Sequence, residues 1–443
     1  MSGLAVGAWI FVGLMVAMVV RLHVATAMFV AGAAAFLIMN DGDANALLFT
    51  INNLAYARLS NYDLAVVPLF ILMGQFATYG GLSQALFRCA AAFIGHWRGG
   101  LAMAATLACA GFGAICGSSL ATAATMGQVA LPELRRHGYS GRLATGTIAA
   151  GGTLGILIPP SVPLIIYAVL TQESIGKLFM AAVIPGIIAT VGYMAVIGLT
   201  VMRNPASGPA GERRSMRERL LSLLAVTPVL GVFLVVIVGI YDGWANPTEA
   251  ASIGVAACGI LAITSGGLRW SGIRKSILGT AEATAMIFLI LLGADLLNAG
   301  LALTQMPVEL GNWIIETGQT PLVVLFTILI IYVLLGCIMD SLAMILLTIP
   351  IYYPIIMKLE FFGLSVPDKS VWFGILSLMV VEIGLITPPL GMNLFIIEKL
   401  AKGVPFTETV KGVMPFIASD MVRILLVVFI PALSLVLVNG LSG

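Results

Sequence analysis

Two pairs of adjacent prolines, each inside a long apolar stretch, are the residues of this sequence best placed to bind a ligand. The pairs are Pro159-Pro160 and Pro388-Pro389. Proline lacks a backbone N–H and clashes with the carbonyl one turn earlier, so two in succession break a helix. In hydrocarbon, a carbonyl freed in this way is costly unless another group satisfies it. Because Na⁺ takes oxygen ligands, we predict that main-chain oxygens at both breaks bind this cation.

A glycine-bearing polar turn precedes each proline pair. The first turn has two serines after its glycine and a threonine one helical turn later, and the second has an aspartate followed by a serine. These residues offer hydroxyl, carboxylate and carbonyl oxygens, and glycine lets two backbones approach closely. A single proline pair is as often a plain kink, but two copies after similar turns favour binding. The predicted sodium-binding residues are Gly117, Ser118, Ser119, Thr122, Gly155 and Pro159 in the first half, and Gly336, Asp340, Ser341, Gly384, Thr387 and Pro388 in the second.

The helix segments that start after the turns and breaks favour an anion at their N-termini. Their first N–H groups have no partner within the helix, and the helix dipole adds partial positive charge there. We therefore predict that an anionic solute contacts residues at these starts. The predicted solute-binding residues are Ser119, Ser161, Gly391 and Asn393.

Four acidic residues lie inside apolar stretches, where an unpaired charge costs about 2.5–3.5 kcal/mol or more. Asp340, in the second turn, is our first choice for coupling to an ion. Asp420 is expected to pair with Arg423, three residues later. The roles of two acids stay open. Asp295 either faces the site or makes a hydrogen bond between segments. Glu382, two residues before the second break, either acts at that break or packs helices together.

Other groups capable of chemistry have simpler interpretations. The five cysteines lack the spacing of a metal site or a disulfide framework, so we expect small buried hydrophobic residues. The three histidines stand beside charged connections, where we expect interfacial positions. Glu249, in the string Asn-Pro-Thr-Glu, is expected to cap the start of a helix.

The composition places these residues in a membrane protein. Of the 443 residues, 60% are apolar and 9% are charged, whereas a soluble domain has about 25% charged residues. Apolar stretches near the ~20 residues needed to cross a bilayer recur along the chain. The first has neither the basic start nor the small-residue end of a cleaved signal, so we expect a membrane span there.

One alternating path through the membrane separates the charges. It gives most of the 22 basic residues, Arg21 among them, to one side, which the positive-inside rule makes cytoplasmic. The path requires two hairpins that enter and leave by the same face, and interfacial helices at 83–97 and 268–278. The predicted spans are 4–20, 24–39, 64–80, 143–170, 177–200, 220–240, 248–265, 280–303, 371–400 and 412–439, with hairpins at 100–131 and 321–357.

Matching motifs indicate an internal repeat. Three motifs of the first half recur in the second at offsets of 219, 223 and 229 residues. The matched glycines are Gly74 with Gly293, Gly113 with Gly336, and Gly155 with Gly384. Since one hairpin would enter from each face, we predict two inverted repeats, 1–201 and 220–443, joined by a solvated cytoplasmic linker at 202–219. The predicted fold class is an all-α polytopic membrane protein with broken helices.

Together these strings resemble the large membrane subunit of tripartite ATP-independent periplasmic (TRAP) transporters. The matching stretches are GAICGSSLATAATMGQVALPELRRHGYSGRLATGTIAAGGTLGILIPPSVPLIIYAVL, NPTEAA, MDSLAMILLTIPIYYP and VEIGLITPPLGMNLFI. The resemblance implies a sodium-coupled importer of a small organic acid in the bacterial inner membrane, with the fold of elevator-type carriers. It also implies a periplasmic solute-binding protein and a separate small four-helix membrane subunit as partners, besides the membrane lipid.

Carried over residue by residue, the family's sodium-binding regions agree with part of the set above. They fall on Gly117, Ser118, Ser119, Gly155 and Pro159, and on Asp340, Thr387 and Pro388. The chain has Cys116 where many members have a serine before the glycine, which removes one hydroxyl and leaves backbone carbonyl ligation in place.

Two other functions are compatible with parts of the pattern. A stand-alone carboxylate or anion carrier of the same superfamily would need no binding protein. An intramembrane hydrolase using Ser118 or Ser119 would need a base, and the nearby spans hold no histidine or lysine. We therefore expect no enzyme activity. The net charge of +2 is too small to indicate a nucleic-acid partner.

Overall fold

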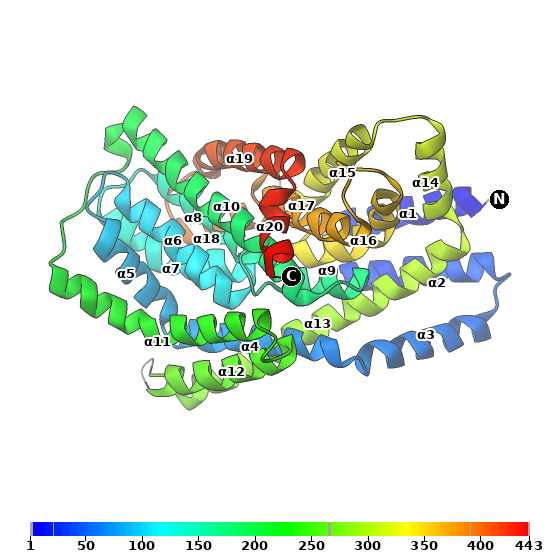
Figure 1. The fold of residues 1–443 in the computed structure, drawn as a ribbon, viewed down its shortest axis with the longest axis horizontal. Helices are drawn as coiled ribbons and strands as arrows, with labels where there is room; N and C mark the ends of the chain where they lie inside the picture. Colours follow the sequence, from blue (N-terminus) through cyan, green and yellow to red (C-terminus); the bar gives the residue numbers. More distant parts are fainter. Residues whose placement is uncertain (1–2, 21, 265–266, 390, 442–443) are drawn as a thin grey trace.

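Helices account for every regular element in the described part of the chain, residues 3–20, 22–264, 267–389 and 391–441 of a computed structural model (Figure 1). Arg21, expected on the cytoplasmic side, lies outside these residues. The α-helices are α1 (Gly3–Val19), α2 (Val24–Met39), α3 (Ala44–Leu59), α4 (Val66–Tyr79), α5 (Leu82–Ile94), α6 (Gly100–Cys116), α7 (Ser119–Arg136), α8 (Gly141–Leu157), α9 (Val162–Thr171), α10 (Ile175–Arg203), α11 (Met216–Tyr241), α12 (Pro247–Thr264), α13 (Trp270–Leu303), α14 (Met306–Glu316), α15 (Pro321–Gly336), α16 (Ser341–Lys358), α17 (Val366–Ile386), α18 (Met392–Leu400), α19 (Phe406–Phe429) and α20 (Ala432–Leu441). Two short 3₁₀ helices are η1 (Tyr62–Ala65) and η2 (Pro205–Ser207).

Nine helical stretches in the described ranges are long and apolar enough to cross a membrane. The fraction of buried residues in each stretch shows which helices lie at the centre of the molecule and which lie at its periphery. Every residue of α17 from Lys369 to Ile386 is buried, so this helix lies at the centre. In contrast, α11 buries Val226, Val236, Gly239 and Ile240 along its 26 residues, and its exposed leucines and valines suit contact with lipid.

The two hairpins and the two broken helices form where the glycine and proline patterns predict them. Helices α6 and α7 meet at Gly117 and Ser118, and α15 and α16 meet at the segment that ends in Asp340. The prolines Pro159-Pro160 separate α8 from α9, and Pro388-Pro389 separate α17 from α18. These prolines cannot continue a helix, which explains why both interruptions lie there.

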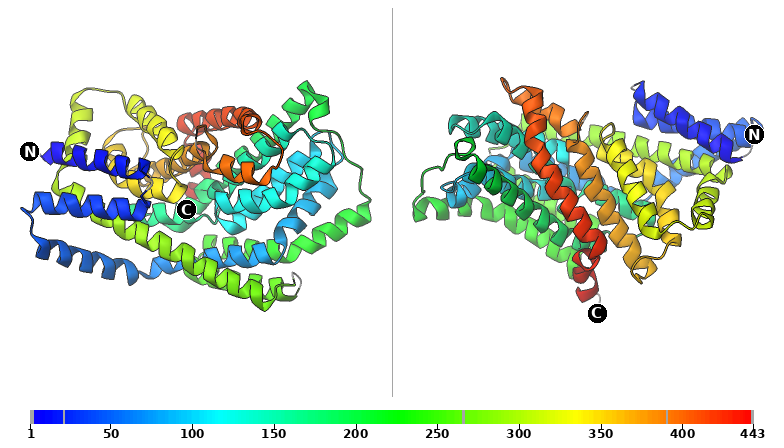
Figure 2. Two further views of the ribbon diagram at one scale, coloured as in Figure 1. Left: turned by 180° about the vertical axis from the view of Figure 1, so that it is seen from behind. Right: turned by 90° about the horizontal axis from the view of Figure 1, so that it is seen from above.

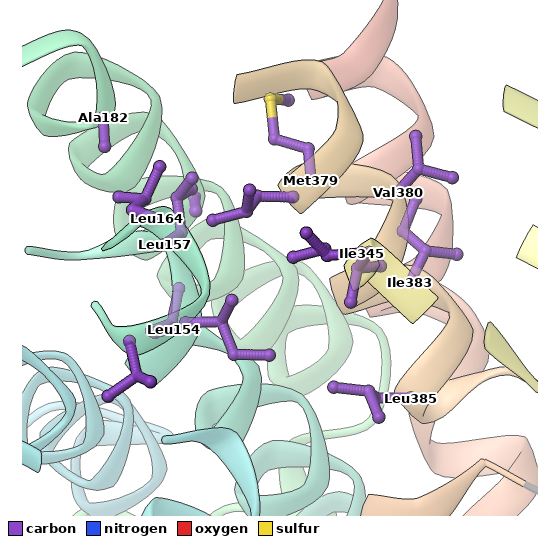
Figure 3. Packing of buried hydrophobic residues seen from close by; sticks show 14 of the residues in the cluster. Leu154, Leu157, Leu164, Ala182, Ile345, Met379, Val380, Ile383 and Leu385 are labelled. Carbon is purple, nitrogen blue, oxygen red and sulfur yellow. The ribbon is translucent and has the colours of Figure 1, made fainter. Parts of the chain in front are cut away.

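The hairpins and broken helices interlock across the two halves of the sequence. Each broken helix packs against its own hairpin, α8 on α6 and α7, and α17 on α15 and α16. In addition, α9 packs on α16, and α18 packs on α7 (Figure 1). Figure 3 shows the shared apolar core, with Leu154, Leu157 and Leu164 of the first half near Ile345 and Met379 of the second. We call α6–α9 together with α15–α18 the interlocked body.

Helix α19 closes one side of this body. Seen from above in Figure 2, it runs alongside α17. It also crosses α8 at a point where Gly146 and Gly412 touch, because a Cβ on Gly146 would lie 2.5 Å from the Gly412 carbonyl carbon. Side chains larger than hydrogen at either position would separate the two helices.

The structure corrects the interfacial helix predicted at 268–278. This segment is the start of α13, a continuous helix from Trp270 to Leu303. No proline interrupts it, so its hydrogen bonds run through the expected boundary near residue 280. The other predicted interfacial helix, 83–97, corresponds to α5 and ends at Ile94.

Two helices, α3 and α14, occupy segments that the predicted spans leave unassigned. Helix α3 begins at an N-cap, where the carboxylate of Asp43 accepts hydrogen bonds from the Asn45 and Ala46 amides. This cap is the signal in the sequence that marks the helix start.

The linker 202–219 is partly packed rather than fully solvated. Helix α10 extends to Arg203, and three backbone hydrogen bonds then fasten the linker to neighbouring turns. The Ser207 carbonyl accepts from Ser140, the Gly208 carbonyl accepts from Gly99, and the Gly211 amide donates to Gly95. The inverted insertion of the halves 1–201 and 220–443 stays a prediction.

Candidate functional site

The first turn and the first break lie against each other. Ser118 caps α7 by accepting from the Ala121 amide at 3.4 Å, and its carbonyl accepts from the Thr122 hydroxyl at 2.7 Å. A Cβ on Gly155 would lie 2.6 Å from the Thr122 hydroxyl oxygen and 2.9 Å from the Ser118 carbonyl oxygen. Glycine at 155 therefore brings these two oxygens to the last turn of α8.

Gly117 brings the same turn to the far side of the break. A Cβ at this position would lie 3.0 Å from the Pro160 carbonyl oxygen, and its φ of +64° is a conformation that glycine adopts readily. Pro159 and Pro160 are both buried beside it. The structure thus brings the predicted residues of the first half together around one interruption of a helix.

The second turn and break repeat this contact. A Cβ on Gly384 would lie 2.5 Å from the Gly336 Cα, just as a Cβ on Gly113 would lie 2.5 Å from the Gly155 Cα. These are the glycines that the repeat motifs align. Both halves therefore join hairpin to broken helix by a glycine–glycine contact.

Carbonyl oxygens gather at the second break. A Cβ on Gly391 would lie 2.8 Å from the Leu385 carbonyl oxygen and 3.0 Å from that of Thr387. The Thr387 hydroxyl donates to the Ile383 carbonyl at 2.6 Å. Thr387 and Pro388 are half-buried, and Pro389 is exposed, so this break is more open than the first.

Asp340 and Ser341 stand where the second hairpin turns into α16. Asp340 is half-buried and caps this helix, because its Oδ1 accepts from the Ala343 amide at 3.2 Å. Ser341 is the first residue of the helix and is also half-buried. The cap is a structural role for the Asp340 carboxylate, and its second oxygen stays a candidate ion ligand.

Three of the four predicted solute-binding residues carry buried polar atoms without a hydrogen-bond partner. These atoms are the hydroxyl oxygens of Ser119 and Ser161 and the side-chain oxygen of Asn393. The amide nitrogen of Asn393 donates to the Ala149 carbonyl at 3.1 Å, which orients the side chain from α18 toward α8. An unsatisfied buried polar atom costs about 1–3 kcal/mol, so these are the atoms that a bound ligand would satisfy. Thr147 on α8 has the same property, although no sequence motif marks it.

Three of the four acids in the apolar stretches form two ion-pair groups away from the hairpin turns, and Asp340 is the exception. Asp295 accepts two hydrogen bonds from Arg58 on α3, one of them at 2.6 Å from Nη2, so it joins segments rather than facing the site. Arg423 binds Asp420 at 2.9 Å, as predicted, and Glu382 at 2.6 Å. Breaking a buried pair of this kind by removing one partner costs about 3–5 kcal/mol. Glu382 is therefore a packing partner of α19.

The remaining groups have the expected simple roles. All five cysteines are free, and four of them are buried. Glu249 and Asn246 exchange hydrogen bonds between side chain and backbone amide at 2.9 Å, a reciprocal cap at the start of α12. Among the described residues, no group of three His, Cys, Asp or Glu side chains could hold a metal ion. A cation at the breaks would therefore be held mainly by carbonyl and hydroxyl oxygens.

Two polar cavities lie at opposite ends of the first broken helix. One, of about 980 Å³, lies just before the start of α8, between the C-terminal end of α7, α5 and the linker, with Arg88 and Arg136 in its lining. The other, of about 610 Å³, lies at the end of α9 and is lined by Arg58, Asp63 and Glu173.

Comparisons with known proteins show the family. Residues 11–433 match the family described as "Tripartite ATP-independent periplasmic transporter, DctM component". The chain is 37% identical over 385 residues to the C4-dicarboxylate TRAP transporter large permease protein DctM of Pseudomonas aeruginosa, covering 86% of this chain and 87% of that one. It is 31% identical to the sialic acid TRAP transporter large permease protein SiaM of Vibrio cholerae, with the same coverage.

A fused relative and a solved structure extend the comparison. The isethionate TRAP transporter permease protein DctMQ of Oleidesulfovibrio alaskensis is 29% identical, and the match covers 86% of this chain and 59% of that protein. The crystal structure of the YdaH transporter of Alcanivorax borkumensis has the same fold, with a TM-score of 0.63, 14% identity and 90% of each chain covered.

These matches agree with the nine apolar helices, which make the chain a multi-pass protein of the bacterial inner membrane. They also make it a transporter component rather than an enzyme. The chain therefore belongs to the DctM family, the large permease component of the tripartite ATP-independent periplasmic transporters.

Proposed function

We propose that this permease imports a small organic acid of the carboxylate class together with Na⁺, by alternating access of an elevator type. The observation that carries the proposal is the set of unsatisfied buried oxygens of Ser119, Ser161 and Asn393, beside two helix breaks rich in carbonyls. A carboxylate would accept hydrogen bonds from the Ser119 and Ser161 hydroxyls, and a cation would satisfy the Asn393 side-chain oxygen and the carbonyl oxygens of the breaks. The relatives named for C4-dicarboxylates and for sialic acid transport acids of this class.

Sodium provides a sufficient driving force for this import. Each cation moving inward gains about 2.3 kcal/mol per 100 mV of membrane potential, in addition to its concentration gradient. Two cations, one at each break, would offset the inward movement of one carboxylate and still concentrate the acid.

The elevator movement is supported by how the two halves pack. Because α9 packs on the second hairpin and α18 on the first, neither hairpin can shift alone without exposing the core between them. The interlocked body would therefore move as one unit and carry its site between the two faces.

The partners follow from the names of the relatives. TRAP transporters deliver their solute through a periplasmic binding protein, and we propose such a protein for this permease. The fused DctMQ relative has additional length beyond this chain. A separate small membrane subunit of four helices would supply the corresponding part here.

Uptake into proteoliposomes tests the proposal. The reconstituted permease and small subunit are given labelled organic acids, with and without the cognate binding protein, at zero and high external sodium. We expect uptake that requires both sodium and the binding protein. Uptake that proceeds equally in potassium would refute sodium coupling, and uptake without the binding protein would identify a stand-alone carrier instead.

A further inference from the structure

A chain of buried hydrogen bonds connects the two broken helices. The Tyr193 hydroxyl donates to Asp420 at 2.7 Å and lies 3.2 Å from the Thr153 hydroxyl. The Thr153 hydrogen completes this link when it points to Tyr193 in place of the Ala150 carbonyl, 2.8 Å away. Arg423 then bridges Asp420 at 2.9 Å and Glu382 at 2.6 Å. These five side chains come from α8, α10, α19 and α17, and we call them the polar chain. None is more than 2% exposed.

The polar chain ends at equivalent places in the two halves. Thr153 lies two residues before Gly155, and Glu382 lies two residues before Gly384. Those glycines touch the two hairpins, and they are separated by the same 229 residues as the two ends of the polar chain. The polar chain therefore joins the last turn of α8 to the last turn of α17, where each helix breaks.

Burial makes this connection stiff. In a medium of low dielectric constant, hydrogen bonds to charged groups are strong, and a displaced partner finds no water to replace them. One nitrogen of Arg423, Nη2, serves both carboxylates, so a shift of α17 against α19 must break one of these bonds or recruit the buried Nε or Nη1, which have no partner. A change in position of one break is thereby passed to the other.

We infer that the polar chain couples the two predicted cation regions, so that a sodium ion at one break increases the affinity for sodium at the other. The inference rests on the proposed function. A cation drawn to the carbonyls around Gly155 would fix the last turn of α8, and the polar chain would hold α17 in the matching position. Coupling between sites typically changes affinity by about 5-fold to 150-fold, and it acts in both directions.

Tyr193→Phe is the variant that tests the coupling most directly. It removes the hydroxyl that joins Thr153 to Asp420 and leaves no buried charge unpaired, since Arg423 still binds Asp420. The ring can keep its edge-to-face contact with Phe416, at a centroid distance of 5.3 Å. Thr153→Val cuts the same bond from the other side and serves as a second variant should one fail to fold.

The measurement is the dependence of thermal unfolding on sodium concentration in the purified full-length protein, repeated as sodium-dependent uptake. We expect a steep response in the natural protein. In both variants we expect a shallower response, approaching that of independent sites, and a sodium concentration for half-maximal effect raised about 10-fold. The double variant should respond like either single one, because both changes interrupt the connection between α8 and Asp420.

Tyr139→Phe is the matched control. This buried tyrosine also uses its hydroxyl in a hydrogen bond, accepting from the Leu101 amide at 3.1 Å, but it precedes α8, at the opposite end of that helix from the break. Its sodium response should equal that of the natural protein.

The outcomes separate the inference from the proposed function. If the natural protein responds steeply to sodium and both variants keep its steepness and midpoint, the polar chain does not couple the sites, and sodium-driven import stands. A shift in Tyr139→Phe as large as in Tyr193→Phe would likewise refute the coupling. If the natural protein shows no response that distinguishes sodium from potassium, both the function and the coupling are wrong.

Discussion

Buried hydroxyls without partners are unusual because their desolvation is not repaid within the protein. Ser119 follows the first turn, Ser161 follows the first break, and Asn393 follows the second break. Each lies at the start of a helix, where the first backbone amides have no partner within the helix. Other unsatisfied buried atoms, such as the Ser377 hydroxyl, lie away from the interruptions, so the binding role of these three residues is a prediction that requires its own test.

Removal of one of these hydroxyls should affect stability and transport in opposite directions. Ser119→Ala relieves an unsatisfied buried group, so we expect the free energy of unfolding without ligand to stay equal or rise by about 1 kcal/mol. Uptake should weaken, with KM raised up to about 10-fold for the lost hydrogen bond. Thermal unfolding and uptake kinetics measure the two effects. Ser377→Ala, at a fully buried serine of α17 outside the predicted site, should leave uptake unchanged, and equal losses in both variants would contradict the assignment.

Asp340 can be tested for ion coupling apart from its role as a cap. Asp340→Asn preserves the acceptor that caps α16 but removes the charge. We expect loss of sodium-driven uptake with little change in stability, whereas Asp340→Ala should also lose about 1 kcal/mol from the missing cap. If Asp340→Asn transports normally, the carboxylate is a cap and nothing more. Chromatography of the solubilised protein checks that each variant is folded.

At the scale of elements, the glycine–glycine contacts decide how closely hairpin and broken helix approach. The two contacts are local consequences of sequence, since both glycine pairs belong to the motifs that reveal the repeat. The helices could not approach as closely with any larger side chain. Because the predicted oxygens come from both partners, the distance across this contact would also set the size of the predicted cation site.

Substitution at the contacts should therefore destabilise both halves to a similar extent. For Gly384→Ala, the new Cβ would lie 2.5 Å from the Gly336 Cα, and for Gly155→Ala it would lie 2.6 Å from the Thr122 hydroxyl oxygen. We expect each to cost about 1–3 kcal/mol from overpacking and to impair sodium-dependent uptake. The control is Gly231→Ala in α11, where a Cβ meets nothing within 4 Å. Thermal unfolding that is unchanged at Gly384→Ala would show that the contact is looser than described.

Local signals account for what the sequence predicts well at this scale. Proline pairs and glycine turns act within a few residues, so the positions of the hairpins and the breaks follow from the amino-acid sequence. Helix α3 has few strong apolar signals, so the predicted spans leave it out. Helix α13 lacks a stop signal in its sequence, and the prediction divides it into an interfacial helix and a span. The pairing of Arg58 with Asp295, and of Arg423 with Glu382, depends on which helices pack together, and no local pattern encodes that.

For the whole molecule, the charge distribution predicts the orientation in the membrane. The linker between the halves carries Arg213 and Arg214, both exposed, and the positive-inside rule assigns it to the cytoplasm. Upstream of these arginines, the linker is fastened to the turns near Gly95 and Gly99. The exposed part is thus a short stretch just before α11, accessible to a protease from one side only.

Limited proteolysis tests this orientation. Trypsin should cleave after Arg213 or Arg214 in inverted membrane vesicles, giving two large fragments, and should leave these bonds intact in right-side-out spheroplasts. Mass spectrometry of the fragments locates the cut. A replacement of both arginines by glutamine controls for cleavage elsewhere. Cleavage at these bonds from the outside would reverse the predicted orientation of the whole path.

The exchange of partners between halves also has a consequence for biosynthesis. Helix α9 is synthesised long before α16, which packs on it. Helix α7 is likewise synthesised long before α18, which packs on it. During translation, the first half must therefore remain in the bilayer with these faces covered by lipid or by the insertion machinery. Two separately expressed pieces, divided within the linker, would each stay immature alone and would complete their folding only when produced in the same cell.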